Sequence, residues 1–225
     1  MTSINLERCI SIRKLPDLCA PNLEKLNLSY CENLIEINEA IGSLDKLKSW
    51  NLMECKKLQI LPNALRLKSL EYLNLYGCVS LEKFPNIHRE TKCDGLYFSH
   101  SNIREWPSSL WILTRGLQKL DLLYCLNLGD ILVSILMKPD SFPRLNYLRI
   151  DGSNIVTIPE SISRFTSLKH LSMRCCKKLR EIPRLPRSIR RVDAANCTSL
   201  DLPSSCRLLN QVSSFPSLDS LYMSV

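Results

Sequence analysis

The chain has 225 residues and a formal net charge of +8, and apolar residues make up 45% of it. This length allows one large domain or two small ones, and the apolar fraction is sufficient for a buried core. The sequence has no continuous apolar run long enough to span a bilayer. Its first residues mix charges with apolar side chains, so we expect neither a transmembrane helix nor a signal peptide.

The positive charge is concentrated near the C-terminal end. Between Arg164 and Arg191 there are ten Lys and Arg residues and one acidic residue, Glu181, a net of +9. The remaining 20 basic and 21 acidic residues nearly cancel. Phosphate or nucleic-acid binding is one interpretation. A solvated face or a contact with an acidic neighbouring domain is favoured, because glycine-rich phosphate loops are absent and aromatic residues do not interleave with the basic ones.

A repeated pattern runs along the chain. From Leu70 to Pro85 it reads L-x-x-L-x-L-x-x-C-x-x-L-x-x-F-P. The spacing of two between Leu73 and Leu75 predicts a short β-strand with one buried face, and the later spacing of three predicts a turn. The pattern starts at Met1, Leu23, Leu47, Leu70, Cys93, Leu117, Leu145, Leu168 and Ile189, with a further start at Leu218. Its period of about 23 residues is the length of a leucine-rich repeat.

The segments between strands vary along the chain. Two repeats replace the cysteine with serine and shorten the turn, at residues 101–107 and 153–159. Segments 108–117 and 160–168 follow prolines and have apolar spacings of three, which predicts one or two helical turns on the outer face. The sixth repeat has a long tail containing ILVSILM, residues 131–137, where we expect a short helix or an irregular bulge.

Together these elements predict an α/β fold, a leucine-rich-repeat solenoid (horseshoe) with a parallel β-sheet on the concave face and loops or short helices on the convex face. We expect residues 1–225 to form a single domain of about nine repeats. Neither end shows a polar capping repeat, so we interpret the chain as a fragment of a longer multidomain protein.

Seven of the eleven cysteines occupy the same position after the strand: Cys9, Cys31, Cys55, Cys78, Cys125, Cys176 and Cys197. Metal binding or redox chemistry is one interpretation. The favoured one is a column of buried thiols that satisfy backbone carbonyls of neighbouring repeats. Zinc is not expected because no C-x-x-C pair has a matching second pair.

The tyrosines indicate a binding surface. All seven fall on positions that the pattern directs to solvent on the concave side, and tyrosine is enriched at protein interfaces. Two histidines share these positions, and several arginines line the basic end of the same face. The predicted binding residues are Tyr30, Tyr72, Tyr76, Tyr97, His100, Tyr124, Tyr147, Arg149, His170, Arg174, Arg190 and Arg191.

The sequence does not indicate catalysis. The three histidines, His88, His100 and His170, have no serine or cysteine partner at a fixed spacing, and the paired carboxylates are scattered over loops. A rigid solenoid without a cleft is poorly suited to an active site. We therefore expect a binding protein with no catalytic residues, no metal and no cofactor.

Three stretches carry a resemblance to a known family. These are the repeated L-x-L-x-x-C-x-x-L-x-x-L-P, the shortened turns SNIREWP and SNIVTIPESI, and the run LREIPRLPRSIRRVDAANCTSL at residues 179–200. They resemble the leucine-rich-repeat region of plant intracellular immune receptors that carry a TIR domain and a nucleotide-binding NB-ARC domain. The chain itself contains no TIR sequence and no P-loop, so the NAD-cleaving activity and nucleotide switch of that family are not carried over.

The resemblance implies that the concave face recognises a pathogen effector or a host protein, while the chain restrains the NB-ARC domain of the same receptor. It implies a cytoplasmic protein, with the nucleus as a second location, and neither nucleic-acid nor membrane binding. The alternative is the substrate-recognition repeat domain of a ubiquitin ligase, of the F-box or bacterial type. An F-box, ligase or NB-ARC segment upstream would discriminate between the two.

Overall fold

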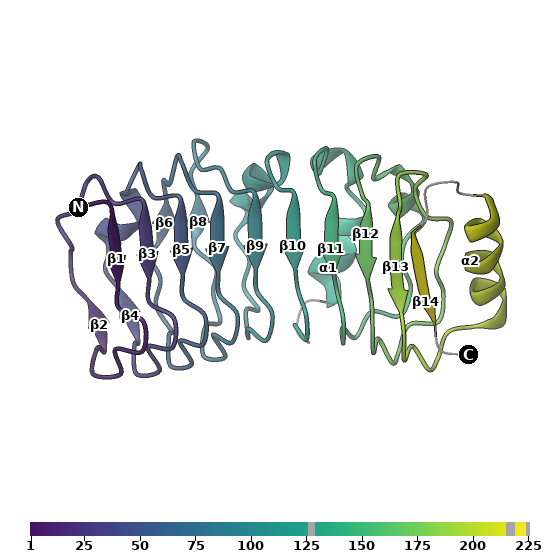
Figure 1. Ribbon diagram of the computed structural model, residues 1–225, viewed down its shortest axis with the longest axis horizontal. Coiled ribbons are helices and arrows are strands. Elements are labelled where there is room, and N and C mark those ends of the chain that lie inside the picture. Colours follow the sequence, from purple (N-terminus) through teal and green to yellow (C-terminus); the bar gives the residue numbers. More distant parts are fainter. Residues whose placement is uncertain (126–128, 215–218, 224–225) are drawn as a thin grey trace. The chain divides into compact units, whose positions relative to one another are not determined.

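The structure is a computed structural model that describes residues 1–125, 129–214 and 219–223 (Figure 1). It divides into two compact units, Met1–Leu117 and Gln118–Val225. The units are described separately below.

Each unit contains a parallel sheet with one strand from each repeat. In Met1–Leu117 the strands follow one another in the order β1 (Ser3–Asn5), β3 (Lys25–Asn27), β5 (Ser49–Asn51), β7 (Tyr72–Asn74) and β9 (Gly95–Tyr97). In Gln118–Val225 the order is β10 (Lys119–Asp121), β11 (Tyr147–Arg149), β12 (His170–Ser172), β13 (Arg191–Ala194) and β14 (Ser220–Met223). Strands pair at equal repeat positions, such as Leu73 with Leu96 and Leu148 with Leu171, which confirms the leucine-rich-repeat fold.

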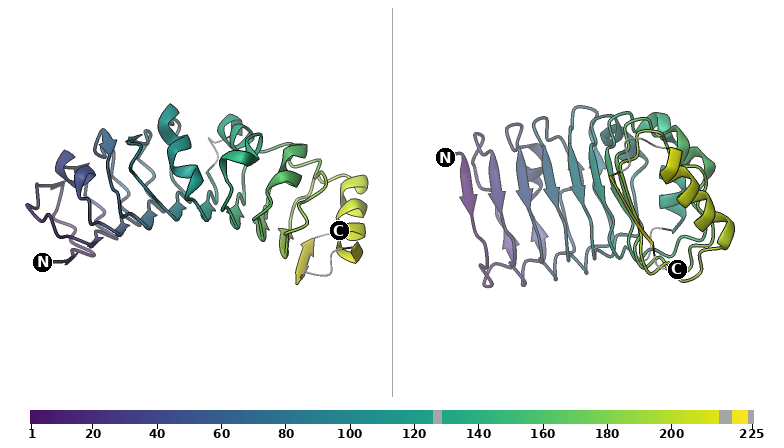
Figure 2. Two further views of the ribbon diagram at one scale, coloured as in Figure 1. Left: turned by 90° about the horizontal axis from the view of Figure 1, so that it is seen from above. Right: turned by 45° about the vertical axis from the view of Figure 1, so that its right-hand side comes forward.

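The side of each unit opposite the sheet carries short helices and minor strands (Figure 2). In Met1–Leu117 these are β2 (Lys14–Leu15) paired with β4 (Glu36–Ile37), β6 (Ala64–Leu65) paired with β8 (Asn86–Ile87), and 3₁₀ helices Glu39–Ser43 and Ser108–Arg115. In the second repeat Asn38 replaces the usual proline and caps the helix, because its side chain accepts a hydrogen bond from the Ala40 N–H.

The second unit contains the longer helices, α1 (Gly129–Leu136) and α2 (Leu202–Ser214), and 3₁₀ helices Pro139–Ser141 and Glu160–Arg164. The predicted helices near residues 131–137 and 160–168 are confirmed. The sequence analysis missed α2 because Pro203 was assigned to a repeat turn. The missed signal is a helix start: the Asp201 carboxylate accepts a hydrogen bond from the Ser204 N–H (2.8 Å), and proline is tolerated in a first turn.

The buried face of each sheet is lined by the leucines of the pattern. Leu73 and Leu75 expose 1% and 0% of their surfaces, and Leu148 and Ile150 are fully buried. Two positions of the sixth repeat, Leu128 and Ile131, and the start at Leu218 lie outside the residues or side chains that the structure describes.

The cysteine column links each repeat to the one before it. The Cys31 thiol donates to the Leu6 carbonyl (3.1 Å), and Cys78 donates to Leu52 (3.2 Å). Cys55, Cys176 and Cys197 make the same bond to the carbonyls of Leu28, Ile150 and Met173. The predicted role of the thiols as donors to carbonyls of a neighbouring repeat is therefore confirmed for these five cysteines, whereas the Cys125 thiol lies 3.9 Å from the Leu123 carbonyl of its own turn.

Burial keeps most of these thiols protonated. Desolvation raises the pKa of Cys55 to about 12, because a buried thiolate would lose its hydration. The pKa of Cys93, a buried thiol at the first position of its repeat, is also raised by burial to about 12. Cys55 and Cys93 therefore remain protonated at neutral pH and are poorly suited to act as nucleophiles. Cys176 differs, because its hydrogen bond with Cys197 lowers its pKa to about 7.

Removing one thiol donor should destabilise the fold. Cys78→Val preserves side-chain volume but leaves the buried Leu52 carbonyl with the Cys55 N–H (3.2 Å) as its only donor, and we expect a loss of about 0.5–1.5 kcal/mol in the free energy of unfolding. Cys78→Ser retains a donor and should cost less. Urea unfolding of the two variants tests this. Cys206→Val, at an exposed position, is the control. Equal losses for the Val and Ser variants would contradict the role of the hydrogen bond.

The fold should also be sensitive to alkali. The folded-state pKa of Cys55 lies above the unfolded value of about 8.5, so its contribution is complete below that pH and is lost as the pH rises towards about 12. Thermal unfolding measured from pH 8 to pH 11 should show stability falling with pH. Cys55→Ser, which does not titrate in this range, should show a shallower decline, and an unchanged slope would argue against the thiol's role.

Candidate functional site

An aromatic patch lies on the exposed sheet face of Met1–Leu117, the side opposite the buried leucines. It consists of Tyr72, Tyr76, Tyr97 and His100, all half-buried. The ring centroids of Tyr72 and Tyr97 are 5.2 Å apart, and those of Tyr76 and His100 are 5.3 Å apart. The structure therefore brings together four of the predicted binding residues.

The register of the strands explains how the patch forms. Tyr72 on β7 pairs with Gly95 on β9, where the absence of a side chain leaves room above the strand. The Tyr97 ring occupies this space, since a Cβ added at Gly95 would lie 3.0 Å from its Cε2. The Tyr72 hydroxyl accepts a hydrogen bond from the Asn74 side-chain amide (2.8 Å), and burial raises the pKa of Tyr72, so the ring is held in place and neutral.

Asparagine and aspartate side chains form turns at the ends of the strands. Asn74 Oδ1 accepts a hydrogen bond from the Tyr76 N–H (2.9 Å), so the chain turns directly after β7 and presents the Tyr76 side chain. The same bond forms at Asn5, Asn27, Asn51, Asp121 and Asp193, each with the N–H two residues later. The sequence analysis missed this set, although the recurring L-N-L triplets were its visible signal.

The residue before each cysteine of the column, or before the serine that replaces it, adopts the left-handed backbone conformation. This holds for Arg8, Tyr30, Glu54, Gly77, His100, Tyr124, Gly152, Cys175 and Asn196, with φ between 53° and 71°. Tyr30, His100 and Tyr124 are therefore displayed from the turn rather than from the strand, at some conformational cost. The Arg8 guanidinium lies 5.5 Å from the centre of the Tyr30 ring, so Tyr30 makes a cation–π contact.

In Gln118–Val225 the predicted aromatic residues are spread more widely. Tyr147 and His170 are half-buried neighbours with ring centroids 6.3 Å apart. Tyr124 is 43% exposed and its ring covers Gly152, where any Cβ would clash with it. His170 is paired in register with Arg191. Burial, with Arg191 as the next cause, lowers the pKa of His170.

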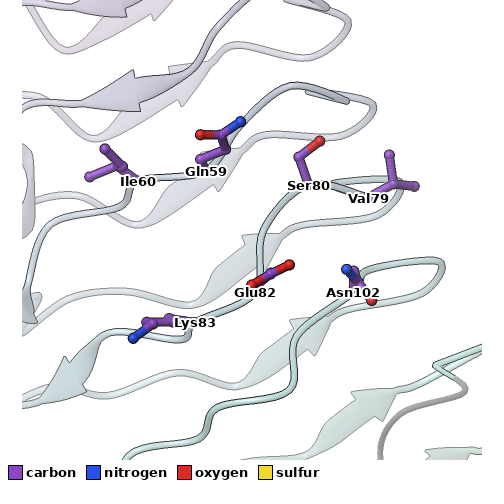
Figure 3. A pocket seen from close by; sticks show the side chains of 7 residues that line it. All are labelled: Gln59, Ile60, Val79, Ser80, Glu82, Lys83 and Asn102. Atoms are coloured by element: carbon purple, nitrogen blue, oxygen red, sulfur yellow. The ribbon is translucent and has the colours of Figure 1, made fainter.

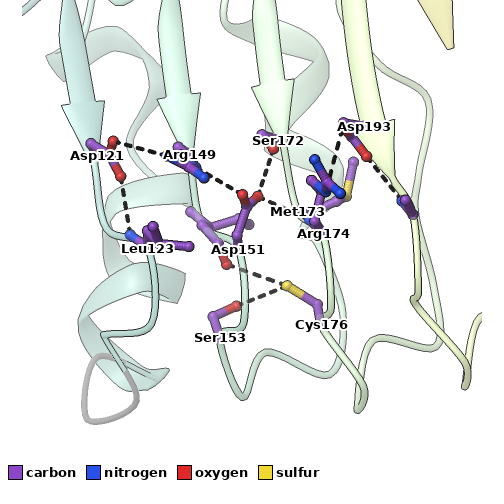
Figure 4. Close-up of polar contacts among 12 residues, drawn as sticks. Asp121, Leu123, Arg149, Asp151, Ser153, Ser172, Met173, Arg174, Cys176 and Asp193 are labelled. Atoms are coloured by element: carbon purple, nitrogen blue, oxygen red, sulfur yellow. Dashed lines mark hydrogen bonds and ion pairs between the residues drawn. The ribbon is translucent and has the colours of Figure 1, made fainter. Parts of the chain in front are cut away.

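The predicted arginines serve two different roles. Arg149 belongs to a polar network centred on the buried Asp151 carboxylate (Figure 4). Its Nε lies 2.8 Å from Asp151 Oδ2, and its Nη1 lies 3.6 Å from Asp121 Oδ2. Arg174, Arg190 and Arg191 are instead exposed. Arg149 is therefore engaged in cross-linking repeats and has less freedom to bind a partner.

Asp151 compensates for the absence of an Asn or Asp side chain at position 172 in the next repeat. Ser172 occupies the position where six other repeats have Asn or Asp (Asn5, Asn27, Asn51, Asn74, Asp121 and Asp193), so its side chain does not bond to the N–H two residues later as theirs do. Asp151 Oδ1 accepts hydrogen bonds from the Ser172 hydroxyl (2.6 Å) and the Arg174 N–H (2.9 Å). The sequence analysis missed Asp151, whose role depends on contacts between repeats.

A hollow of about 650 Å³ lies between the turns of the third and fourth repeats (Figure 3). Parallel bridges join Glu36 to Ile60 and Lys83 to Glu105, but within the described chain none joins Ile60 to Lys83, so the turns separate there. The lining residues are Gln59, Ile60, Val79, Ser80, Glu82, Lys83 and Asn102. This lining includes no histidine or cysteine and does not form a nucleophile–base pair.

The described residues also provide no metal centre, because no three His, Cys, Asp or Glu side chains among them are grouped suitably for an ion. Among the helices that the structure describes, none is both long and apolar enough to cross a bilayer. The chemistry that the exposed faces offer is therefore aromatic contact, hydrogen bonding and charge pairing.

Known proteins similar to this chain come mainly from plants. It is 36% identical over 189 residues, 76% of its length, to the protein SUPPRESSOR OF npr1-1, CONSTITUTIVE 1 of Arabidopsis thaliana, covering 13% of that protein. It is 32% identical over 214 residues, 93% of its length, to TMV resistance protein N of Nicotiana glutinosa, covering 16% of that protein. The chain thus spans less than a fifth of the length of these relatives.

A search of family models found no match. Among solved structures, the leucine-rich-repeat domain of the type III effector XopL aligns with 99% of this chain and 68% of that chain, at 17% identity and a TM-score of 0.39. Further sequence relatives at 33% and 36% identity are named disease resistance proteins. Over most of its length, the chain is therefore homologous to plant TIR-NB-LRR disease resistance proteins.

Proposed function

We propose that this chain is the protein-binding module of an intracellular plant immune receptor, that it recognises a pathogen effector or a host protein, and that it is not an enzyme. The observation that carries the proposal is the aromatic patch of Tyr72, Tyr76, Tyr97 and His100. Its rings are ordered before any partner binds, so binding costs little side-chain entropy. The disease resistance proteins related to this chain support placing such a surface in an immune receptor.

The same proposal assigns roles to the other predicted binding residues. Tyr30, Tyr124, Tyr147, His170, Arg174, Arg190 and Arg191 extend the contact surface, and Arg149 supports it through Asp151. Residues 1–225 act as one repeat domain. The domain works without a cofactor and binds neither nucleic acid nor membranes, and the receptor acts in the cytoplasm, with the nucleus as a second location.

We further propose that the chain restrains an NB-ARC domain of the same receptor until a partner binds. The relatives are several times longer than this chain, which leaves room for such a domain. A partner that competes for the restraining contacts would release the nucleotide switch, because binding shifts the receptor only through its differential affinity for the two states.

Proximity labelling in plant cells tests the patch. The chain is compared with a variant carrying Tyr72→Ser, Tyr76→Ser and Tyr97→Ser, which removes three large rings and leaves the buried leucines unchanged. We expect loss of specific partners, because aromatic anchors contribute most to such interfaces. Circular dichroism and thermal melting establish that the variant remains folded, which matters because Tyr72 bonds to Asn74.

A matched control removes exposed apolar side chains away from the sheet. Ile10, Ile60 and Val79 are 61%, 48% and 51% exposed, and the control variant replaces all three with serine. Its partners should be unchanged. If the folded tyrosine variant retains every partner, or if both variants lose the same ones, the patch is not the recognition surface.

A further inference from the structure

Five of the nine lysines of Met1–Leu117 pair with carboxylates of the adjacent repeat. Lys14 pairs with Glu36 (2.6 Å), and Lys48 pairs with Glu24 (2.9 Å). Lys56–Glu32, Lys68–Asp45 and Lys83–Glu105 are further pairs of this kind, with distances of 2.8–3.1 Å. Such exposed pairs add little stability individually. The 15 Lys and Arg residues of this unit are nearly balanced by 13 Asp and Glu residues, a net of +2.

The segment Arg164–Arg191 is built differently. All ten of its Lys and Arg side chains are exposed, and only two of them form ion pairs within the described chain: Arg164 with Asp140 and Arg174 with Asp193. The other eight have no carboxylate within ion-pair distance among the described residues. They are Lys169, Lys177, Lys178, Arg180, Arg184, Arg187, Arg190 and Arg191.

Three of these eight form a basic row where β12 and β13 begin: Lys169, Arg190 and Arg191. The Lys169 carbonyl accepts hydrogen bonds from the N–H groups of Arg190 (2.8 Å) and Arg191 (2.9 Å), so the three residues start from adjacent backbone positions. Neighbouring strands are about 4.8 Å apart, which holds their charges close together. Asp219, the residue just before β14, lies beside the row, because its N–H donates a hydrogen bond to the Arg190 carbonyl (2.7 Å).

We propose that the basic row of Lys169, Arg190 and Arg191 docks an acidic segment of a partner protein. The partner's carboxylates supply the counter-charges that adjacent repeats supply in Met1–Leu117, and they relieve the repulsion between three neighbouring cations. A helix with Asp or Glu at i and i+4 fits the row, since such side chains start about 5–6 Å apart. The inference rests on the proposed function only in taking the partner to be a protein.

The surroundings of the row favour a protein over a nucleic acid. Asp193 lies on β13 two residues after Arg191, and the exposed Asp219 directly precedes β14, the strand next to β13. A continuous phosphate backbone crossing this face would pass over these carboxylates and be repelled by them. An acidic protein segment can place its carboxylates on the row and uncharged side chains over the aspartates.

The test is fluorescence anisotropy with a labelled peptide of alternating glutamate and alanine as the probe. The whole chain is compared with the double variant Arg190→Gln, Arg191→Gln. We expect the affinity to fall about three- to tenfold, as for the loss of two exposed charge contacts, and the difference to shrink as salt is added. Circular dichroism establishes that the variant is folded.

The matched control is Lys177→Gln, Lys178→Gln, which removes the same charge from the turn after β12. This control should bind the peptide almost as tightly as the unchanged chain. Equal weakening of both variants would mean that only net charge matters, and the docking surface would be wrong. Tighter binding of oligothymidylate or phosphatidylserine vesicles than of the peptide would also overturn it. Since Tyr72, Tyr76 and Tyr97 stay intact, failure here does not contradict the aromatic patch.

Discussion

Hydrogen bonding between repeats is the constraint on which both units depend. A strand of three residues cannot satisfy its own backbone groups, so each repeat must bond to its neighbours. The sheets do this along the strands, and the cysteine column continues it at the turns, where Cys55 and Cys78 donate to carbonyls of the preceding repeat. A small buried donor is needed at this position, which explains why cysteine recurs. Ser153, which replaces cysteine in the seventh repeat, instead contacts the Cys176 thiol (3.4 Å).

The same stacking determines which side chains are left for a partner. Asn74 and its equivalents are occupied in closing strands, and Arg149 is occupied by the carboxylates of Asp151 and Asp121. Positions that have no such task carry tyrosine and histidine in both units, and in Gln118–Val225 they also carry the basic row of Lys169, Arg190 and Arg191. The residues proposed to bind partners are thus those that are not needed to hold neighbouring repeats together.

Much of the fold was predictable because residues at the same position of successive repeats contact one another, so aligning the repeats identifies contacts between residues distant in sequence. Aligning the starts at Leu70 and Cys93 gives the pairing of Leu73 with Leu96, and it also gives the cysteine column and the exposed tyrosines. The role of Asp151 was not predictable in this way. Its carboxylate accepts the hydrogen bond from the Arg174 N–H that an Asn or Asp at position 172 would accept in other repeats. The left-handed turn position was hidden for a similar reason: only Gly77 and Gly152 have the residue type that signals it.

Regularity also limits what a repeat pattern can reveal about function. A pattern specifies what every repeat shares, whereas recognition depends on where repeats differ. Gly95 has no side chain, unlike most strand residues, and this allows the Tyr97 ring to lie above it. Ser172 stands where most repeats have Asn or Asp, and its hydroxyl donates a hydrogen bond to Asp151 of the preceding repeat. The surfaces of interest therefore lie where a repeat breaks the rule and a neighbour compensates, and such positions become visible only when the repeats are stacked.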